Sequence, residues 1–270
     1  MAVAEGTVAT GLSLSQRRSQ EPTMSSPKRL ARIAGVLYLI VGIFGGFAVG
    51  YVTPMLYVPG DAAATTANVV ANAGLVRIGV LADLLQATVF VFLAMTLYVL
   101  LRHVNTSAAR AMVVLVVIAA TIESLDKVFQ FGALRVASDA SYAAAFGAAG
   151  SSALVLLLLD LHNYGYLIAQ IFFGLWLVPL GYLAYKSGMF PRALGIMLII
   201  GGAVYLVDML LKFLVPDFAA TVTAFLIIPF TVAEVWMLVY LLWKGVKDPS
   251  QEPPTIRAGK TGPVLGEALP

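Results

Sequence analysis

Long apolar stretches constrain the fold of this 270-residue chain more than any other feature. A bilayer span needs about 20 mostly apolar residues in an α-helix. With 60% hydrophobic and 11% charged residues, the chain also lies well outside the usual composition of soluble domains. We therefore predict an all-α, polytopic membrane helix bundle with about six transmembrane helices, at residues 32–52, 76–101, 111–131, 163–185, 193–214 and 219–243.

The distribution of basic residues predicts which way the bundle faces. If both termini lie in the cytoplasm, 13 of the 17 Lys and Arg side chains fall on the cytoplasmic side. Such an asymmetry is what the positive-inside rule describes. We therefore expect cytoplasmic N- and C-termini. The basic residues that fall in the outer half or outside are Arg77, Lys127, Arg135 and Lys212.

Polar tails flank the predicted membrane domain, which covers residues 32–243. Residues 1–31 lack the basic start and early apolar core of a signal peptide, so we expect a disordered cytoplasmic tail. Met24 opens MSSPKRLARIAG, a compact basic lead into the first span, and is a possible true translation start. Residues 244–270 are rich in Pro and Gly and predict a second disordered cytoplasmic tail.

Two outer loops are expected, at 53–75 and 132–162. Within the first, Asp61 is placed to cap a short helix that Gly74 ends. The second loop contains the start of a stretch, residues 151–185, that is nearly all apolar. As one helix it would measure about 50 Å at about 1.5 Å per residue, which is too long for a single span. We predict a break at LDLHNYGYL, residues 159–167, which leaves SSALVLLLL as an interfacial or re-entrant piece.

Three stretches of the chain resemble one known family. PGDAAATTANVVA, LLLLDLHNYGYLIAQIFFGLWLVPLGYLAYKSGMFPRALG and GGAVYLVD are similar to bacterial membrane proteins of the domain of unknown function 4386 family. The resemblance covers roughly residues 30 to 247. It implies a six-span or similar architecture in the lipid bilayer of a bacterial inner membrane, and it supplies no catalytic residue.

Charged residues inside the predicted spans form the candidate functional site. Counted from the cytoplasmic end at about 1.5 Å per residue, those of the second, third and fifth spans reach one layer in the outer third of the bilayer. At about 100° per residue, the charges of the third span share one helix face. A charge facing lipid at the centre of a span costs about 2.5 to 3.5 kcal/mol, so these faces are expected to point inward. The candidates for this polar cavity are Asp83, Gln86, Glu123, Asp126, Lys127, Gln130, Asp160, His162, Asp208 and Lys212.

Three interpretations of this layer stay open at the level of sequence. In the one we favour, four acids face only two lysines in a polar cavity open to the outside, which favours binding or transport of a small solute, cation or proton. In the second, the charges form salt bridges that lock a structural or partner-binding membrane protein. In the third, Asp160, His162 and the acids of the layer serve a membrane-embedded enzyme as acid/base groups or metal ligands.

Other function classes find no support in the sequence. The chain has no cysteine and only two histidines, which excludes a disulfide framework, thiolate metal sites and a three-histidine zinc centre. No Gly-rich phosphate loop, nucleophile elbow or HExxH pattern occurs. We therefore expect no cofactor or metal and name no catalytic residue. The net charge of +3 needs no nucleic acid to explain it, and no pattern indicates an oligomeric state.

Overall fold

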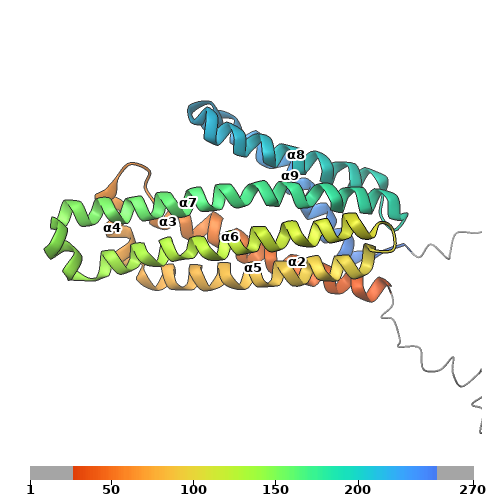
Figure 1. Ribbon diagram of the computed structural model, residues 1–270, viewed down its shortest axis with the longest axis horizontal. Coiled ribbons are helices and arrows are strands. Elements are labelled where there is room, and N and C mark those ends of the chain that lie inside the picture. Colours follow the sequence, from red (N-terminus) through yellow and green to blue (C-terminus); the bar gives the residue numbers. More distant parts are fainter. Residues whose placement is uncertain (1–26, 248–270) are drawn as a thin grey trace, which may run out of the picture.

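Six long apolar helices run along the molecule (Figure 1). The computed structural model describes residues 27–247, and most of both predicted tails, at 1–26 and 248–270, lies outside the described residues. Within the described range the chain contains no strand, so the predicted all-α, polytopic membrane fold is confirmed. The six candidate spans are Pro27–Leu56 (α2, η2 and α3), Ala73–Leu101 (α5), Thr106–Ser138 (α6), Ala140–Ser187 (α7), Arg192–Leu214 (α8) and Pro216–Trp243 (α9).

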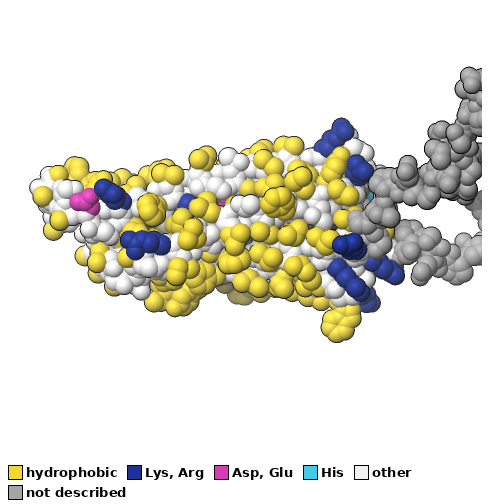
Figure 2. Space-filling model, turned by 90° about the horizontal axis from the view of Figure 1, so that it is seen from below, with side chains coloured by type: hydrophobic (Ala, Val, Ile, Leu, Met, Phe, Trp, Pro, Cys, Tyr) yellow, Lys and Arg dark blue, Asp and Glu magenta, His cyan; other side chains and the backbone are white. Residues whose placement is uncertain are grey.

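Helix α6 shows how the sequence pattern suits a membrane. Beside its charged residues, large apolar side chains point out of the bundle, where Leu125 is 64% and Val128 is 68% exposed. The charged side chains of Glu123 and Asp126, only a few residues away, are buried. Large apolar side chains cover much of the visible face of the molecule in the same way (Figure 2). With this distribution, the apolar side chains contact lipid and the charged side chains stay inside the bundle, away from lipid.

Both described chain ends lie at the same end of the bundle, which we call the terminal end (Figure 1). Helix α2 (Pro27–Phe47) begins there and α9 ends there, as an even number of spans requires. The opposite end is called the distal end. Because both chain ends lie on one side of the bundle, they lie in the same compartment in either orientation. That this compartment is the cytoplasm stays a prediction.

Two apolar cores fill the bundle at different heights. The larger core joins all six spans and includes Leu97, Met112 and Trp176, each at most 1% exposed. The smaller core lies toward the distal end, where Leu56, Val69 and other buried side chains bring α3 (Thr53–Leu56) and α4 (Ala62–Ala71) against the ends of α5, α6 and α7. The charged layer is therefore enclosed by apolar packing on both sides along the bundle.

The short helix α4 confirms one prediction and corrects another. Asp61 is its N-cap, and the Asp61 carboxylate accepts a hydrogen bond of 2.9 Å from the backbone N–H of Ala64. Gly74, which we expected to end this helix, instead lies inside α5. The chain needs only Asn72 to turn from one helix into the next, because Asn72 closes the last turn of α4 with its backbone N–H.

The predicted loop at 132–162 and the predicted break at 159–167 are both wrong. Residues 132–138 complete α6, and α7 runs from Ala140 to Ser187. SSALVLLLL is therefore part of one long helix and no re-entrant piece. The only non-helical backbone inside α7 is at Gly147, whose φ of 72° suits a residue without a Cβ. At about 1.5 Å per residue, α7 is more than twice as long as the hydrocarbon core is thick.

Polar residues continue α7 where we expected them to interrupt it, because each finds a partner on a neighbouring helix. The hydroxyl of Tyr57 donates a hydrogen bond to Asp160, and the His162 ring contacts Asp126 of α6. A polar side chain satisfied across a helix interface leaves the helical backbone intact. The distal part of α7 then packs against α4 and α6.

Glycine pairs bring α7 and α8 into close contact. A Cβ on Gly174 would lie 2.8 Å from the carbonyl oxygen of Gly202, and a Cβ on Gly195 would lie 2.7 Å from that of Gly181. Small residues that face one another in this way let membrane helices approach at backbone distance. This contact fixes α7 against α8 and holds α7 in register for the site described next.

Candidate functional site

The centre of the site is the inward face of α6. Glu123, Asp126, Lys127 and Gln130 recur at helical spacing, and each is only 3% or 4% exposed. Such a row of polar groups inside an apolar bundle carries a large desolvation cost unless each group is paired. The expected inward orientation of these side chains is observed, and their partners come from α5 and α7.

Lys127 joins two helices through its ammonium group. Its Nζ lies 2.8 Å from Oδ2 of Asp83 on α5 and 3.1 Å from Oδ1 of Asp126 on α6 itself. The three side chains are between 2% and 6% exposed. One buried cation therefore serves two buried carboxylates.

A second contact between the same helices joins Gln86 and Glu123. In the amide orientation that satisfies both groups, the Gln86 nitrogen donates to the two Glu123 carboxylate oxygens at 2.6 and 3.1 Å. The amide is neutral, so Glu123 gains hydrogen bonds without a compensating charge. Two side-chain contacts thus join the candidates of α5 and α6, namely Asp83 with Lys127 and Gln86 with Glu123.

Helix α7 completes the group with His162. Its Nδ1 lies 3.3 Å from Oδ1 of Asp126, and the His162 side chain is 8% exposed. The close approach depends on Gly165, where a Cβ would lie only 2.7 Å from the Cβ of Asp126. We call Asp83, Gln86, Glu123, Asp126, Lys127 and His162 the charge cluster.

Several buried polar atoms of the site lack a well-oriented hydrogen bond. These atoms are both carboxylate oxygens of Asp126, Oε1 of Gln130 and Nδ1 of His162. The ammonium and imidazole nitrogens lie within ion-pair distance of Asp126, yet their directions do not satisfy a hydrogen bond. Unsatisfied buried polar groups are costly, so these atoms are the part of the site where a further hydrogen-bonding partner would be stabilising.

A small cavity lies beside these atoms, between the cluster and the distal end. Its volume is about 10 Å³, close to the space that one water molecule needs. Polar groups on three elements face it, so a single water here would find several hydrogen-bonding partners. The lining residues are Thr53, Leu56, Tyr57, Gln130, Leu159, His162 and Asn163.

Tyr57, which lines this cavity, also contacts Asp160. The Tyr57 hydroxyl donates its hydrogen bond to Oδ1 of Asp160. Burial and this hydrogen bond to Asp160 raise the pKa of Tyr57 from 10.0 to about 12. The sequence treats Asp160 as a candidate but gives no sign of Tyr57, because a tyrosine at the end of a span is expected at any membrane interface.

Asp208 and Lys212 form a separate pair on α8. Lys212 Nζ lies 2.6 Å from Oδ2 of Asp208, while the hydroxyl of Thr223 on α9 donates to Oδ1 of Asp208 at 2.9 Å. Within residues 27–247, no hydrogen bond or ion pair links these residues to the charge cluster. The structure therefore brings α7, rather than α8, to the charges of α5 and α6.

Glu234 of α9 lies outside the charge cluster. Its carboxylate accepts a hydrogen bond of 3.0 Å from the hydroxyl of Tyr38 on α2. This contact ties the first span to the last. Glu234 thus offers a second intramembrane carboxyl with a partner of its own, which is useful for comparison with Asp126.

The residues that the structure describes contain no group of three or more His, Asp or Glu side chains placed to hold a metal ion. Asp160 and His162, which we considered together as metal ligands or acid/base groups, have different partners. Asp160 contacts Tyr57, and His162 contacts Asp126. The two residues therefore do not share one site in the structure that we describe.

Comparisons with known proteins agree with the membrane fold and add no activity. An uncharacterized protein of Archaeoglobus fulgidus is 46% identical over 46 residues, which are 17% of this chain and 28% of that relative. No solved structure matches the chain. The family described as "Domain of unknown function (DUF4386)" matches residues 33–245, which is well over half of the chain. This multi-pass membrane chain therefore belongs to the domain of unknown function 4386 family.

Proposed function

We propose that this protein binds protons at the charge cluster and moves them across the membrane. The observation that carries the proposal is that Asp83 and Asp126 share the ammonium of Lys127 within the bundle, while the buried carboxylate of Glu123 has only the neutral amide of Gln86 as its partner. Crowded carboxyl groups in a medium of low dielectric favour the uptake and sharing of protons. Ionisable groups inside membrane spans commonly mark proton pathways.

The size of the adjacent cavity favours a proton over a larger cargo. About 10 Å³ accommodates a single water. Sites for organic solutes usually have volumes of about 300 to 1,000 Å³. A metal cation would also have to approach the ammonium of Lys127, which repels it. A proton needs only polar groups close enough to pass it on, and Nδ1 of His162 lies 3.3 Å from Oδ1 of Asp126.

The surroundings of the cluster support access from the distal end. On that side, Tyr57, Gln130 and Asn163 face the water-sized cavity. On the terminal side, the large apolar core with Leu97 and Met112 separates the cluster from the surface. A complete transfer across the membrane would therefore require the helices to rearrange after the proton has bound.

We place the protein in a bacterial inner membrane, with the terminal end in the cytoplasm. The described part of the terminal end carries nine basic side chains on the helix ends and connections, and no acidic one. This distribution supports the orientation through the positive-inside rule. Protons would then enter the distal cavity from outside the cytoplasm.

Proton movement in proteoliposomes tests the proposal. Purified protein is reconstituted with a pH-sensitive dye inside, and a potassium gradient with valinomycin sets the membrane potential. Wild type is expected to acidify or alkalinise the interior according to the sign of the potential. Asp126→Asn keeps the shape of the side chain but removes the titrating group, so it should abolish the response. Glu234→Gln is the matched control, because Glu234 is an intramembrane carboxyl outside the cluster.

Two results would overturn the proposal. If wild-type liposomes behave like empty ones over both signs of the potential, the cluster does not move protons. If Asp126→Asn conducts as well as wild type while its free energy of unfolding drops, the charges act as the structural lock that the second interpretation of the sequence describes.

A further inference from the structure

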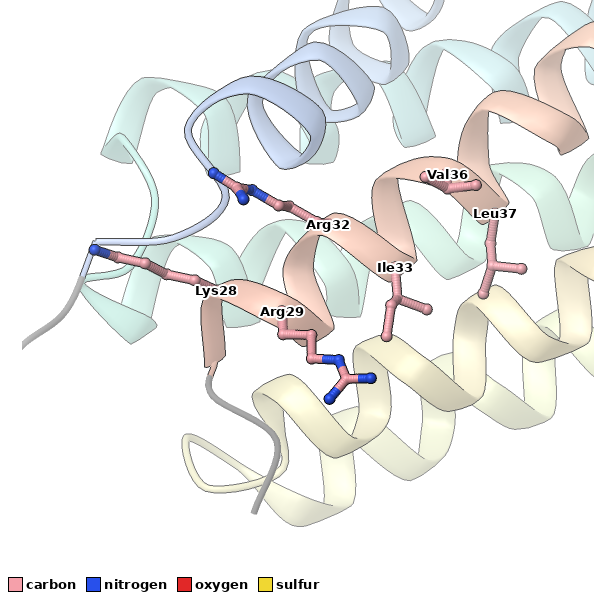
Figure 3. A pocket seen from close by; sticks show the side chains of 6 residues that line it. All are labelled: Lys28, Arg29, Arg32, Ile33, Val36 and Leu37. Atoms are coloured by element: carbon pink, nitrogen blue, oxygen red, sulfur yellow. The ribbon is translucent and has the colours of Figure 1, made fainter. Parts of the chain in front are cut away.

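A groove at the terminal end of α2 combines basic and apolar side chains. Its volume is about 420 Å³, and the residues within 27–247 that line it come from the first three turns of the helix (Figure 3). Residues spaced by four lie along one ridge of a helix. The lining side chains form two such ridges, namely Lys28, Arg32 and Val36 on one and Arg29, Ile33 and Leu37 on the other.

Each ridge changes from basic to apolar in the direction of the bilayer. Lys28, Arg29 and Arg32 lie nearest the terminal end, and Ile33, Val36 and Leu37 follow them (Figure 3). A phospholipid in that leaflet has the same polarity along its length, with its phosphate at the interface and its chains toward the bilayer centre. The groove therefore matches a lipid in both chemistry and direction.

Most of this side of α2 faces away from the bundle, and only Leu37 at its inner end packs against the larger core. Ala31, Ala34 and Tyr38 are the buried side chains that pack against the other helices. Ile33 and Val36, by contrast, are 41% and 49% exposed. In the membrane, these exposed apolar side chains meet the acyl chains of the surrounding lipid.

Charge complementarity identifies an anionic headgroup. The described part of the terminal end has nine basic side chains and no acidic side chain that could neutralise them. Basic clusters at a membrane surface attract anionic lipids at about 1 kcal/mol per Lys or Arg. Two of the other basic side chains at this end stack on aromatic rings, as Arg102 does on Tyr98 and Arg192 on Tyr185. No such ring contact occupies Lys28 or Arg32 in the structure that we describe.

We propose that this groove binds one anionic phospholipid, with its phosphate held by Lys28 and Arg32 and an acyl chain lying along Ile33 and Val36. The two basic residues belong to successive turns of α2, so they approach the phosphate from adjacent levels. The apolar side chains below them make the site selective for a lipid rather than a free phosphate ion. This site is independent of the charge cluster, which lies deeper in the bundle.

Native mass spectrometry of the delipidated protein in detergent tests the proposal. Dioleoyl phosphatidylglycerol and dioleoyl phosphatidylcholine, which share their acyl chains, are titrated separately to obtain the Kd of the first bound lipid. The anionic lipid is expected to bind more tightly. Lys28→Gln with Arg32→Gln should weaken its binding about thirtyfold, the loss expected for two interfacial cations.

Matched variants separate a built site from a diffuse charge effect. Arg110→Gln with Lys186→Gln removes two exposed cations at the same end but outside the groove, so the Kd should change less than threefold. The charge-preserving pair Lys28→Arg with Arg32→Lys should retain binding, which also guards against a folding defect. Ile33→Ala with Val36→Ala should weaken binding of both lipids through the lost chain contact.

Three results would overturn the proposal. Equal affinity for the two lipids would remove the headgroup preference. Equal losses in the groove pair and in the Arg110 and Lys186 pair would indicate only a general surface charge. Displacement of the lipid by inorganic phosphate at similar concentration would indicate an ion site with no role for the apolar side chains.

Discussion

The ammonium of Lys127 lies 2.8 Å from the carboxylate of Asp83, and both side chains are almost completely removed from the surface of the bundle. This single ion pair connects α5 to α6 at the level where His162 of α7 approaches Asp126. Breaking one member of a buried pair costs far more than the pair contributes, because the remaining charge stays buried without a partner. The cluster thus constrains how three helices pack, in addition to the proton binding that we propose for it.

Loss of the cation should destabilise the bundle strongly. Lys127→Gln leaves Asp83 and Asp126 without their shared ammonium, and we expect the free energy of unfolding to drop by about 3 to 5 kcal/mol. Titration with sodium dodecyl sulfate in mixed micelles measures the change. Adding Asp83→Asn should recover part of the loss, because one uncompensated charge is then removed.

The exposed ion pair of the same helix provides the control for Lys127. Arg135 lies 3.4 Å from Asp139, and the Arg135 side chain is 70% exposed. Exposed pairs contribute little in water, so Arg135→Gln should leave the unfolding curve nearly unchanged. If Lys127→Gln and Arg135→Gln have equally small effects, the buried ion pairs do not stabilise the bundle.

The contact between Tyr57 and Asp160 should make stability depend on alkaline pH. The pKa of Tyr57 is raised from 10.0 to about 12, with burial as the largest cause. The folded protein therefore keeps a proton that the unfolded chain releases above about pH 10. This contribution is fully present below pH 10 and is lost as the pH rises to about 12.

Tyr57→Phe tests this linkage. At neutral pH the variant should lose about 1 kcal/mol of stability, the usual net value of one hydrogen bond. From about pH 10 to pH 12 the difference from wild type should shrink, since wild type loses the contribution that the variant never had. Unfolding followed at several alkaline pH values measures the difference. A constant gap between the two proteins across this range would contradict the assignment.

Gly165 should be irreplaceable at the interface of α6 and α7. A Cβ at this position would lie 2.7 Å from that of Asp126, so Gly165→Ala must push the helices apart or displace Asp126. Overpacking of this kind costs about 1 to 3 kcal/mol. Thermal unfolding in detergent should show the loss.

Gly132 of α6 is the control, because it is also a glycine within a membrane helix. A Cβ there would lie 3.7 Å from Leu158, an ordinary contact distance. Gly132→Ala should therefore leave stability unchanged or raise it by up to about 1 kcal/mol through better helix propensity. Equal behaviour of the two variants would mean that α7 does not depend on Gly165 for its approach.

Thr223 should stabilise the contact of α8 with α9. Its hydroxyl donates to Asp208, a side chain with no exposed surface. Thr223→Val keeps the shape but leaves one buried carboxylate oxygen without its donor, which costs about 1 to 3 kcal/mol. Thr221→Val is the comparison, since the Thr221 hydroxyl donates only to the carbonyl oxygen of Phe218 in its own helix. Unfolding curves with indistinguishable midpoints for both variants would argue against this tie.

The sequence alone determined the class of fold and the local pattern of the charges. Length and hydropathy identify six spans, because the thickness of a bilayer sets how many apolar residues a helix must supply. Helical periodicity placed Glu123, Asp126 and Lys127 on one face, because 100° per residue is a property of the helix itself. Because a charged side chain that faces lipid costs free energy, the sequence also predicted that this face points into the bundle.

Only the tertiary structure decided which helices meet at that face. Depth along each span predicted Asp208 and Lys212 as neighbours of the α6 charges, whereas the structure supplies His162 from α7 and leaves the α8 pair with Thr223. Depth is a local count, but the order and rotation of helices follow from contacts distant in sequence, such as Gly165 against Asp126. The same reason explains why α7 continues through residues 159–167 without a break, since Asp160 becomes acceptable within a helix once Tyr57 lies opposite it.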